Sequence, residues 1–116
     1  MLGEVDFCRD RYTSIYSAHL IMRIFEVKDK SGRVIYLSDE RWKHILEHRE
    51  MQNKLVLEKI KDALINPNKI MPDRYDSSAR VYYKHYKDRN EYLAVLVNYL
   101  NGEGFIITSF YTDQIK

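Results

Sequence analysis

The apolar residues change their spacing at Asn66-Pro67-Asn68, and this change divides most of the chain into a helical part and a strand part. Between residues 39 and 66 apolar residues recur at helical spacing, whereas from Lys69 onwards the period is two. Proline lacks the N–H that a helix interior needs, so a helix has to end here. Because helices and strands arrive in separate runs, the predicted fold class is α+β.

The strand part predicts an antiparallel meander. Asp88-Arg89-Asn90 and Asn101-Gly102-Glu103-Gly104 are expected to be its turns, and Asn-Gly is a strong hairpin signal. The run 93–97 is apolar on both faces and should lie at the centre of the sheet. With a short first strand included, the predicted strands are 69–71, 80–87, 92–100 and 104–111.

The helical part follows a predicted hairpin, formed by strands 21–27 and 34–37 with Gly32 in the turn. The first helix should begin near Asp39, with Ser38 or Asp39 as its N-cap. The predicted architecture is two helices on one face of a twisted antiparallel sheet of about four strands, preceded by this hairpin. The other face of the sheet would be open and lined by Tyr, Lys, Arg and Thr. The second helix takes its apolar face from Val56, Leu57, Ile60, Ala63 and Leu64.

A length of 116 residues fits one domain. Since Met22 directly precedes the first strong strand, residues 22–116 are predicted to be a single α+β domain and residues 1–21 an N-terminal extension. Residues 1–20 have no clean period and are expected to form either a short helix or a loose arm.

Composition indicates in which compartment the protein is expected and which partners it could have. Cys8 is the only cysteine and cannot form an intrachain disulfide, and the start of the chain lacks the features of a secretory signal. No apolar run approaches the ~18 residues of a membrane span. We therefore expect a cytoplasmic protein with no membrane partner. The net charge of +2 neither requires nor excludes nucleic acid.

His44 and His48 are four residues apart, so a regular helix would stack them, with Cβ atoms roughly 5–6 Å apart. Two such imidazoles could touch one phosphate or one metal ion. The sequence His-Ile-Leu-Glu-His lacks the glutamate directly after the first histidine that the zinc-protease motif requires, and no third ligand is apparent. We therefore predict no metal site and no cofactor. The alternative is that both are ordinary, partly buried helix residues.

Residues along the predicted strand 80–87 alternate between two faces, one cationic and aromatic and the other carrying Tyr83. From Lys69 to Arg89 there are six Lys or Arg against three Asp, a pattern that single-stranded RNA binding would use. The alternative is a solvated edge strand whose lysines prevent aggregation. The residues of the cationic and aromatic face are Arg80, Tyr82, Lys84 and Tyr86.

The last strand carries Thr108 on one face and Tyr111 on the other. Hydroxyl groups in a buried strand could satisfy the backbone, or they could donate hydrogen bonds to a phosphate oxygen.

Four motifs in this order resemble one known family. They are His-Ile-Leu-Glu-His-Arg, Ile-Asn-Pro-Asn-Lys-Ile, Val-Tyr-Tyr-Lys and Gly-Phe-Ile-Ile-Thr-Ser-Phe-Tyr-Thr. Over about residues 33–112 the chain is similar to the phage-associated nuclease family of the barnase, EndoU, colicin and RelE superfamily. The resemblance implies a small metal-independent ribonuclease, a toxin or prophage-type effector, with two helices on a four-stranded antiparallel sheet.

The resemblance also implies roles for single residues. His48 is the first choice for general acid or base, with His44 in support, while Lys84 would sit on the phosphate. Thr108 and Tyr111 would complete the site. The reaction would be attack of the ribose 2′-OH on the adjacent phosphorus to give a 2′,3′-cyclic phosphate. The residues expected to bind RNA are Arg80, Tyr82, Tyr83 and Tyr86.

Two other functions stay open. One is a ribosome-dependent messenger-RNA nuclease of the RelE type, and the other is a non-catalytic RNA- or protein-binding module. RNA is the expected partner, and a toxin would also have a neutralising antitoxin protein. A tyrosine-rich open face could equally serve as a homodimer surface.

Overall fold

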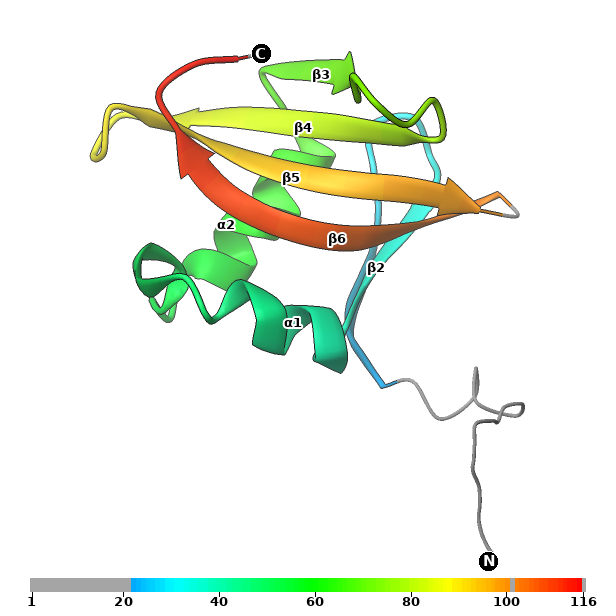
Figure 1. Ribbon diagram of the computed structural model, residues 1–116, viewed down its shortest axis with the longest axis horizontal. Helices are drawn as coiled ribbons and strands as arrows, with labels where there is room; N and C mark the ends of the chain where they lie inside the picture. The colour runs from blue at the N-terminus through cyan, green and yellow to red at the C-terminus, as the bar shows by residue number, and fades with distance from the viewer. Residues whose placement is uncertain (1–21, 101, 116) are drawn as a thin grey trace, which may run out of the picture.

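Six strands form one sheet in the order β1-β2-β6-β5-β4-β3, and two α-helices lie on one side of it (Figure 1). The computed structural model describes residues 22–100 and 102–115, so the helix or arm expected at 1–20 lies outside the described residues. The elements are β1 (Arg23–Lys28), β2 (Val34–Ser38), α1 (Asp39–Ile45), the 3-10 helix η2 (Arg49–Met51), α2 (Val56–Ile65), β3 (Lys69–Pro72), β4 (Ala79–Tyr86), β5 (Glu91–Leu100) and β6 (Glu103–Thr112). The α+β class is confirmed.

The β1–β2 hairpin is part of the main sheet and is not a separate element that precedes it. Gly32 has the positive φ of +90° that its turn requires. Beyond the hairpin, β2 pairs in parallel with β6, with Ile35 opposite Gly104. The expectation of four antiparallel strands with a separate hairpin is therefore corrected to one six-stranded, mostly antiparallel sheet. A parallel pair joins distant segments and leaves no turn signal in the sequence.

Gly104 in β6 lies between β2 and β5, opposite Ile35 on one side and Tyr99 on the other. A Cβ atom at this position would lie 3.0 Å from side-chain carbons of both Ile35 and Val97. That distance is shorter than an ordinary van der Waals contact. The absence of a side chain at Gly104 therefore lets the hairpin dock closely on the meander.

The first helix begins as predicted and ends early. The Ser38 side chain accepts a hydrogen bond from the backbone N–H of Arg41 at 3.2 Å, as an N-cap does. The helix then stops at Ile45, so it does not continue to His48 as a regular helix carrying both histidines would. A turn and the 3-10 helix η2 replace its last part. Ile45 and Met51, on either side of this change, are both fully buried.

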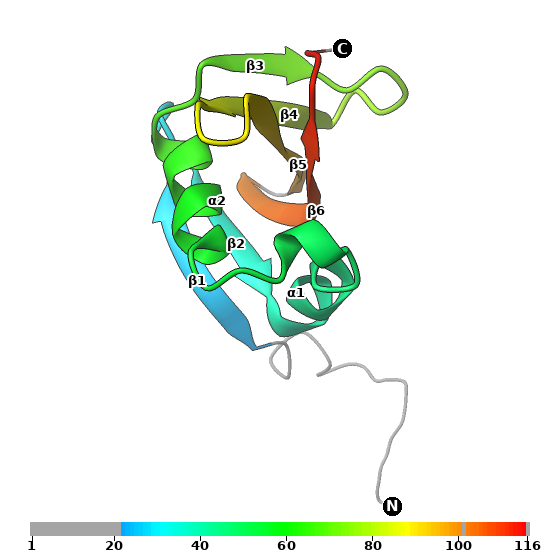
Figure 2. The ribbon, with the colours of Figure 1, turned by 90° about the vertical axis from the view of Figure 1, so that its left-hand side faces the viewer.

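The core lies between the helices and the inner face of the sheet. β5 and β6 are the two central strands, and the apolar run 93–97, expected at the centre of the sheet, lies in β5. The sheet curves around α2, with β1 and β2 along one side of the helix and β3 and β4 above it (Figure 2). The apolar face of α2 is buried as expected, at Val56, Ile60, Ala63 and Leu64.

Candidate functional site

The two histidines are neighbours on the surface. His44 lies in the last turn of α1 and His48 is the N-cap of η2. Their ring centroids are 6.4 Å apart and the rings are nearly perpendicular, at 85°. The expected proximity holds even though the helix breaks between them.

Both imidazoles are open to solvent, which disagrees with the interpretation that they are partly buried helix residues. The side chain of His44 is 47% exposed, and its Nδ1 lies 3.7 Å from the carboxylate of Glu47. The buried side chains of Ile45 and Met51 hold the backbone on both sides of His48. The backbone that carries the two histidines is therefore fixed by buried neighbours, while both imidazole rings stay accessible to solvent.

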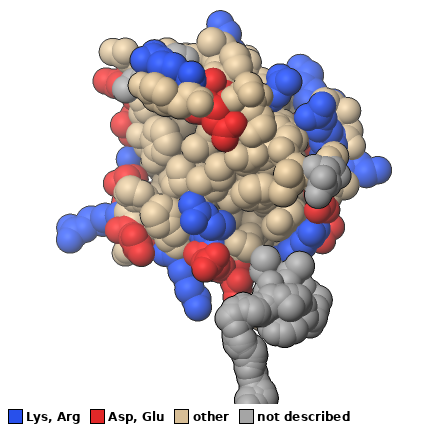
Figure 3. All heavy atoms as spheres, turned by 45° about the vertical axis from the view of Figure 1, so that its right-hand side comes forward, with Lys and Arg blue, Asp and Glu red and all other residues tan. Residues whose placement is uncertain are grey.

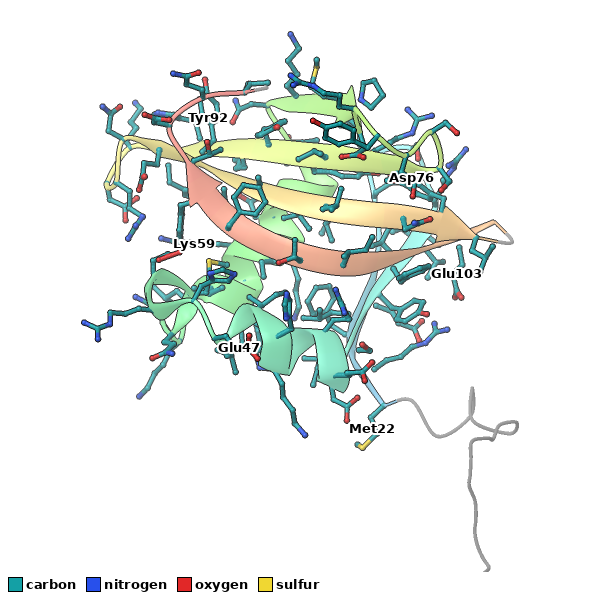
Figure 4. All side chains as sticks on the ribbon, in the orientation of Figure 1. Met22, Glu47, Lys59, Asp76, Tyr92 and Glu103 are labelled. Carbon is teal, nitrogen blue, oxygen red and sulfur yellow. The ribbon has the colours of Figure 1, made fainter. Side chains whose placement is uncertain are left out.

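The α1 helix is fastened to the sheet at β6. The Nε of Arg41 donates a hydrogen bond to the carbonyl of Ile107 at 2.9 Å. Both α1 and η2 pack against β6, so the histidine pair sits beside the strand that also carries Tyr111. Figure 4 shows Glu47 on the segment below β6, and Lys59 on α2 near the end of the sheet where β6 finishes.

The cationic and aromatic residues of β4 face the helices, not the open side of the sheet as expected. The Nζ of Lys84 donates a hydrogen bond to the carbonyl of Asn66 at 2.9 Å and lies 3.9 Å from the carboxylate of Asp62. The hydroxyl of Tyr86 lies 3.1 Å from both the carboxylate of Asp62 and the carbonyl of Lys59, and its single proton is shared between these two acceptors. This end of β4 is therefore bound to α2.

Tyr111 belongs to the same face as Lys84. Lys84 is opposite Leu93, and Leu93 is opposite Tyr111, so the three side chains form one row across β4, β5 and β6. The guanidinium of Arg89 lies 4.0 Å from the centroid of the Tyr111 ring. The structure thus brings Lys84, Tyr86 and Tyr111 to one end of the helix-side face.

The electrostatics of this end keep the Tyr86 hydroxyl protonated. Burial, with the neighbouring carboxylate of Asp62 adding to it, raises the pKa of Tyr86 well above its ordinary value. The Nζ of Lys59 lies 4.9 Å from the Tyr86 ring centroid and 3.5 Å from the carboxylate of Asp88. Tyr86 therefore acts as a hydrogen-bond donor at neutral pH.

Thr108 and Tyr83 lie on the other face of the sheet. Thr108 is opposite Leu96, and Leu96 lines a groove of about 620 Å³ together with Tyr83 and Phe110. The sequence-predicted site is therefore split between two faces. Much of the open face is uncharged, with Lys and Arg side chains gathered around its edges (Figure 3).

Tyr82 is almost fully buried, at 1% exposure, and its hydroxyl is bonded to Asp29 and Tyr99. It therefore has no exposed ring on which a base could stack. Arg80 is exposed and lies beside the same residues at the mouth of a small cavity.

The sequence reading missed the partners of the helix-side residues. Asp62 and Lys59 lie one turn apart on α2, and Arg89 lies in the β4–β5 turn. That these charges lie beside Lys84, Tyr86 and Tyr111 becomes apparent only when the packing of α2 against β4 is known. The local sequence does carry a signal at Asp29, since an aspartate that opens a turn commonly accepts hydrogen bonds from the following backbone.

Within residues 22–100 and 102–115, no group of three or more His, Cys, Asp or Glu side chains is placed to hold a metal ion. Among the described residues, no helix is long and apolar enough to cross a membrane.

The domain is an α+β fold with its helices on one face of a curved, mostly antiparallel sheet, and the histidine pair lies beside the strand that carries Tyr111. Residues 22–116 match the family model described as phage-Barnase-EndoU-ColicinE5/D-RelE like nuclease2, and the chain belongs to that family. Comparisons with curated proteins and with solved structures gave no match.

Proposed function

We propose that this protein is a metal-independent endoribonuclease that cleaves RNA by attack of a ribose 2′-OH on the adjacent phosphorus. The observation that carries the proposal is the pair of exposed imidazoles, 6.4 Å apart, on the segment that packs against β6. Histidine is the residue type that exchanges protons most readily near neutral pH. Two adjacent imidazoles can serve as the base and the acid of one transfer.

In the proposed reaction His48 takes the proton of the 2′-OH or gives a proton to the leaving 5′-oxygen, and His44 supports it. The 2′-oxygen forms a bond to phosphorus while the bond to the 5′-oxygen breaks. The products are a 2′,3′-cyclic phosphate and a free 5′-hydroxyl. DNA lacks the 2′-OH and would not be cleaved.

Lys84 is the proposed cation that stabilises the extra negative charge on the phosphorane. Its Nζ is already held by the Asn66 carbonyl and lies close to Asp62, so its position is fixed before substrate binds. Tyr86 and Tyr111 share its face and would contribute hydroxyl groups and ring surface. Thr108 faces the opposite side of the sheet and has no role in this proposal.

The test is incubation of the purified full chain with mixed RNA and EDTA, followed by analysis of the new ends. The proposal predicts 2′,3′-cyclic phosphate ends from RNA and no cleavage of DNA of the same sequence. Cleavage that stops when a chelator is added would contradict the mechanism, as would cleavage of DNA.

A second candidate is a RelE-type nuclease that cuts messenger RNA on the ribosome. It is favoured by the basic and aromatic character of Lys84, Tyr86 and Tyr111 on the helix-side face, where Arg89 adds a second cation beside Tyr111. Cleavage of ribosome-bound RNA with no cleavage of free RNA would select this candidate.

We also propose that the protein acts as a toxin and that a neutralising antitoxin protein binds it. Expression of the chain alone should then slow the growth of the host, and the His48→Ala variant should not. Equal growth with both forms would contradict the toxin role.

A further inference from the structure

A small cavity opens between the β1–β2 turn and the helix-side face of β4 and β5. Its volume is about 140 Å³, well below the ~300–1,000 Å³ of pockets for drug-sized ligands. The space suits a small chemical group and not a whole nucleotide. The cavity is lined by Asp29, Ser31, Arg33, Ile70, Arg80, Tyr82 and Tyr99.

The carboxylate of Asp29 is fully occupied by the protein itself. One oxygen accepts the backbone N–H of Ser31 at 2.9 Å, the Ser31 hydroxyl at 2.7 Å and the backbone N–H of Arg33 at 2.9 Å. The other oxygen accepts the hydroxyl of Tyr82. Four donors disperse its charge, so Asp29 offers little to a cation and repels an anion less than an unpartnered carboxylate would.

A count of protons fixes the direction of the next hydrogen bond. Tyr82 has one hydroxyl proton and gives it to Asp29, so the bond between the Tyr82 and Tyr99 hydroxyls is donated by Tyr99. Tyr99 lines the cavity, and its hydroxyl donates to a ligand by rotating its single proton away from Tyr82. Tyr99 is therefore the one tyrosine in this chain of bonds that can become a donor to a ligand.

Two guanidinium groups complete the lining. Arg33 lies over the Tyr99 ring, 4.8 Å from its centroid, and Arg80 lies on the neighbouring strand β4. Among residues 22–100 and 102–115, neither side chain forms an ion pair, whereas Arg23 and Arg89 do. With Asp29 included, the cavity carries two positive charges against one dispersed negative charge. A guanidinium fork matches phosphate oxygens in geometry as well as in charge.

We propose that this cavity is a phosphate subsite, in which Arg33 and Arg80 grip one phosphodiester of an RNA strand and Tyr99 donates a hydrogen bond to it. The proposal rests on RNA being the substrate. Arg80 and Lys84 lie on the same face of β4, four residues and therefore about 13 Å apart along the strand. The subsite would thus bind a phosphate other than the scissile one and position the RNA strand on the protein.

The test measures binding and does not depend on cleavage. The probe is a 2′-O-methyl RNA oligonucleotide, which lacks the free 2′-OH, and its affinity is measured for the full chain over a range of salt concentrations. The variants are Arg80→Gln and the double variant Arg33→Gln/Arg80→Gln. Arg74→Gln is the matched control, because Arg74 is exposed and lines the groove on the opposite face. Thermal unfolding of each variant checks that the fold persists, and Arg80→Gln alone leaves the Arg33–Tyr99 contact in place.

We expect the double variant to bind at least about tenfold more weakly, because the phosphate loses the charge-assisted contacts of two guanidinium groups. The slope of log K against log salt should fall by about 0.7, as for one phosphate of a single strand. Arg74→Gln should leave both values unchanged. Inorganic phosphate is the second probe, and its addition should shift the Tyr99 ring signals in the NMR spectrum of the parent and not of the double variant.

Equal affinity and equal salt slope for parent and double variant would overturn the subsite. Binding of inorganic phosphate with no change in oligonucleotide affinity would also overturn it, because the site would then serve free phosphate. If the double variant loses affinity for the oligonucleotide while the parent does not cleave RNA, the subsite is supported and the proposed catalysis is contradicted. The two failures can therefore be told apart.

Discussion

The hydroxyl of Tyr82 in β4 donates a hydrogen bond to the carboxylate of Asp29 in the β1–β2 turn, across 53 residues of sequence. Both residues are buried, at 1% and 6% exposure. The bond ties the hairpin to the far side of the meander, in addition to the parallel pairing of β2 with β6. It therefore helps to close the curved sheet around α2.

Removal of this hydroxyl should destabilise the fold. In Tyr82→Phe the buried carboxylate of Asp29 loses one of its donors, and we expect a decrease of about 1–3 kcal/mol in the free energy of unfolding. Urea denaturation measures it. Tyr92→Phe is the control, because the Tyr92 hydroxyl has no hydrogen-bond partner among the described residues. Equal losses in the two variants would contradict a special role for the Tyr82 hydroxyl.

Stability should fall in acid through Asp29. Burial favours the neutral carboxyl, but hydrogen bonds from Tyr82, Ser31 and the backbone outweigh burial and hold the pKa of Asp29 below its ordinary value. A carboxyl whose pKa is lowered by folding stabilises the fold above its unfolded pKa of ~3.9, and this contribution is lost as the pH falls through the folded value.

The check is the urea midpoint between pH 7 and pH 2.5 for the parent and for Asp29→Asn. The variant should be less stable at pH 7 and should lose less stability below pH 4. Asp76 and Glu103 also have lowered pKa values and add acid sensitivity to both proteins, so the difference between the two curves reports Asp29. Parallel curves would contradict the assignment.

Gly104→Ala should weaken the junction between the hairpin and the meander. The new methyl group would lie 3.0 Å from carbons of Ile35 and Val97, and overpacking of this kind costs about 1–3 kcal/mol. Thermal unfolding measures the loss. A variant as stable as the parent would mean that β2 and β6 can separate without cost.

Local pattern was enough to predict the strands of the meander, the hairpin turn at Gly32 and the apolar face of α2. It was not enough for the parallel pairing of Ile35 with Gly104, because two strands distant in sequence leave no joint signal. The end of α1 at Ile45 was also missed. The stretch continues with good helix formers, so local propensity places no stop at Ile45.

For the candidate site, alternation grouped Arg80, Tyr82, Lys84 and Tyr86 correctly on one face. It could not say which face α2 covers, because both faces of β4 carry tyrosine. The open face was therefore assigned wrongly, and Thr108 was grouped with residues on the other side. The proximity of His44 and His48 was predictable, since their spacing of four keeps them adjacent even when a helix gives way to a 3-10 turn.

Lys84→Gln should slow RNA cleavage by about 10²–10³-fold, the usual cost of removing one group that stabilises transition-state charge. Lys84→Arg should recover part of the rate because the positive charge remains. Lys61→Gln is the control, since Lys61 pairs with Glu58 on the surface of α2. Unfolding of each variant is measured as well, because Lys84 also binds the Asn66 carbonyl. Unchanged cleavage in a folded Lys84→Gln variant would remove Lys84 from the mechanism.

The most direct measurement of the central claim compares single histidine variants in the cleavage of free RNA with EDTA present. His48→Ala should lose at least about 10²-fold in rate, the contribution of a general acid or base. His85→Ala is the matched control, because His85 lies beside Tyr92 on the other face of the sheet, with ring centroids 5.0 Å apart, and its rate should equal that of the parent. Full activity of a folded His48→Ala variant would contradict the proposed mechanism.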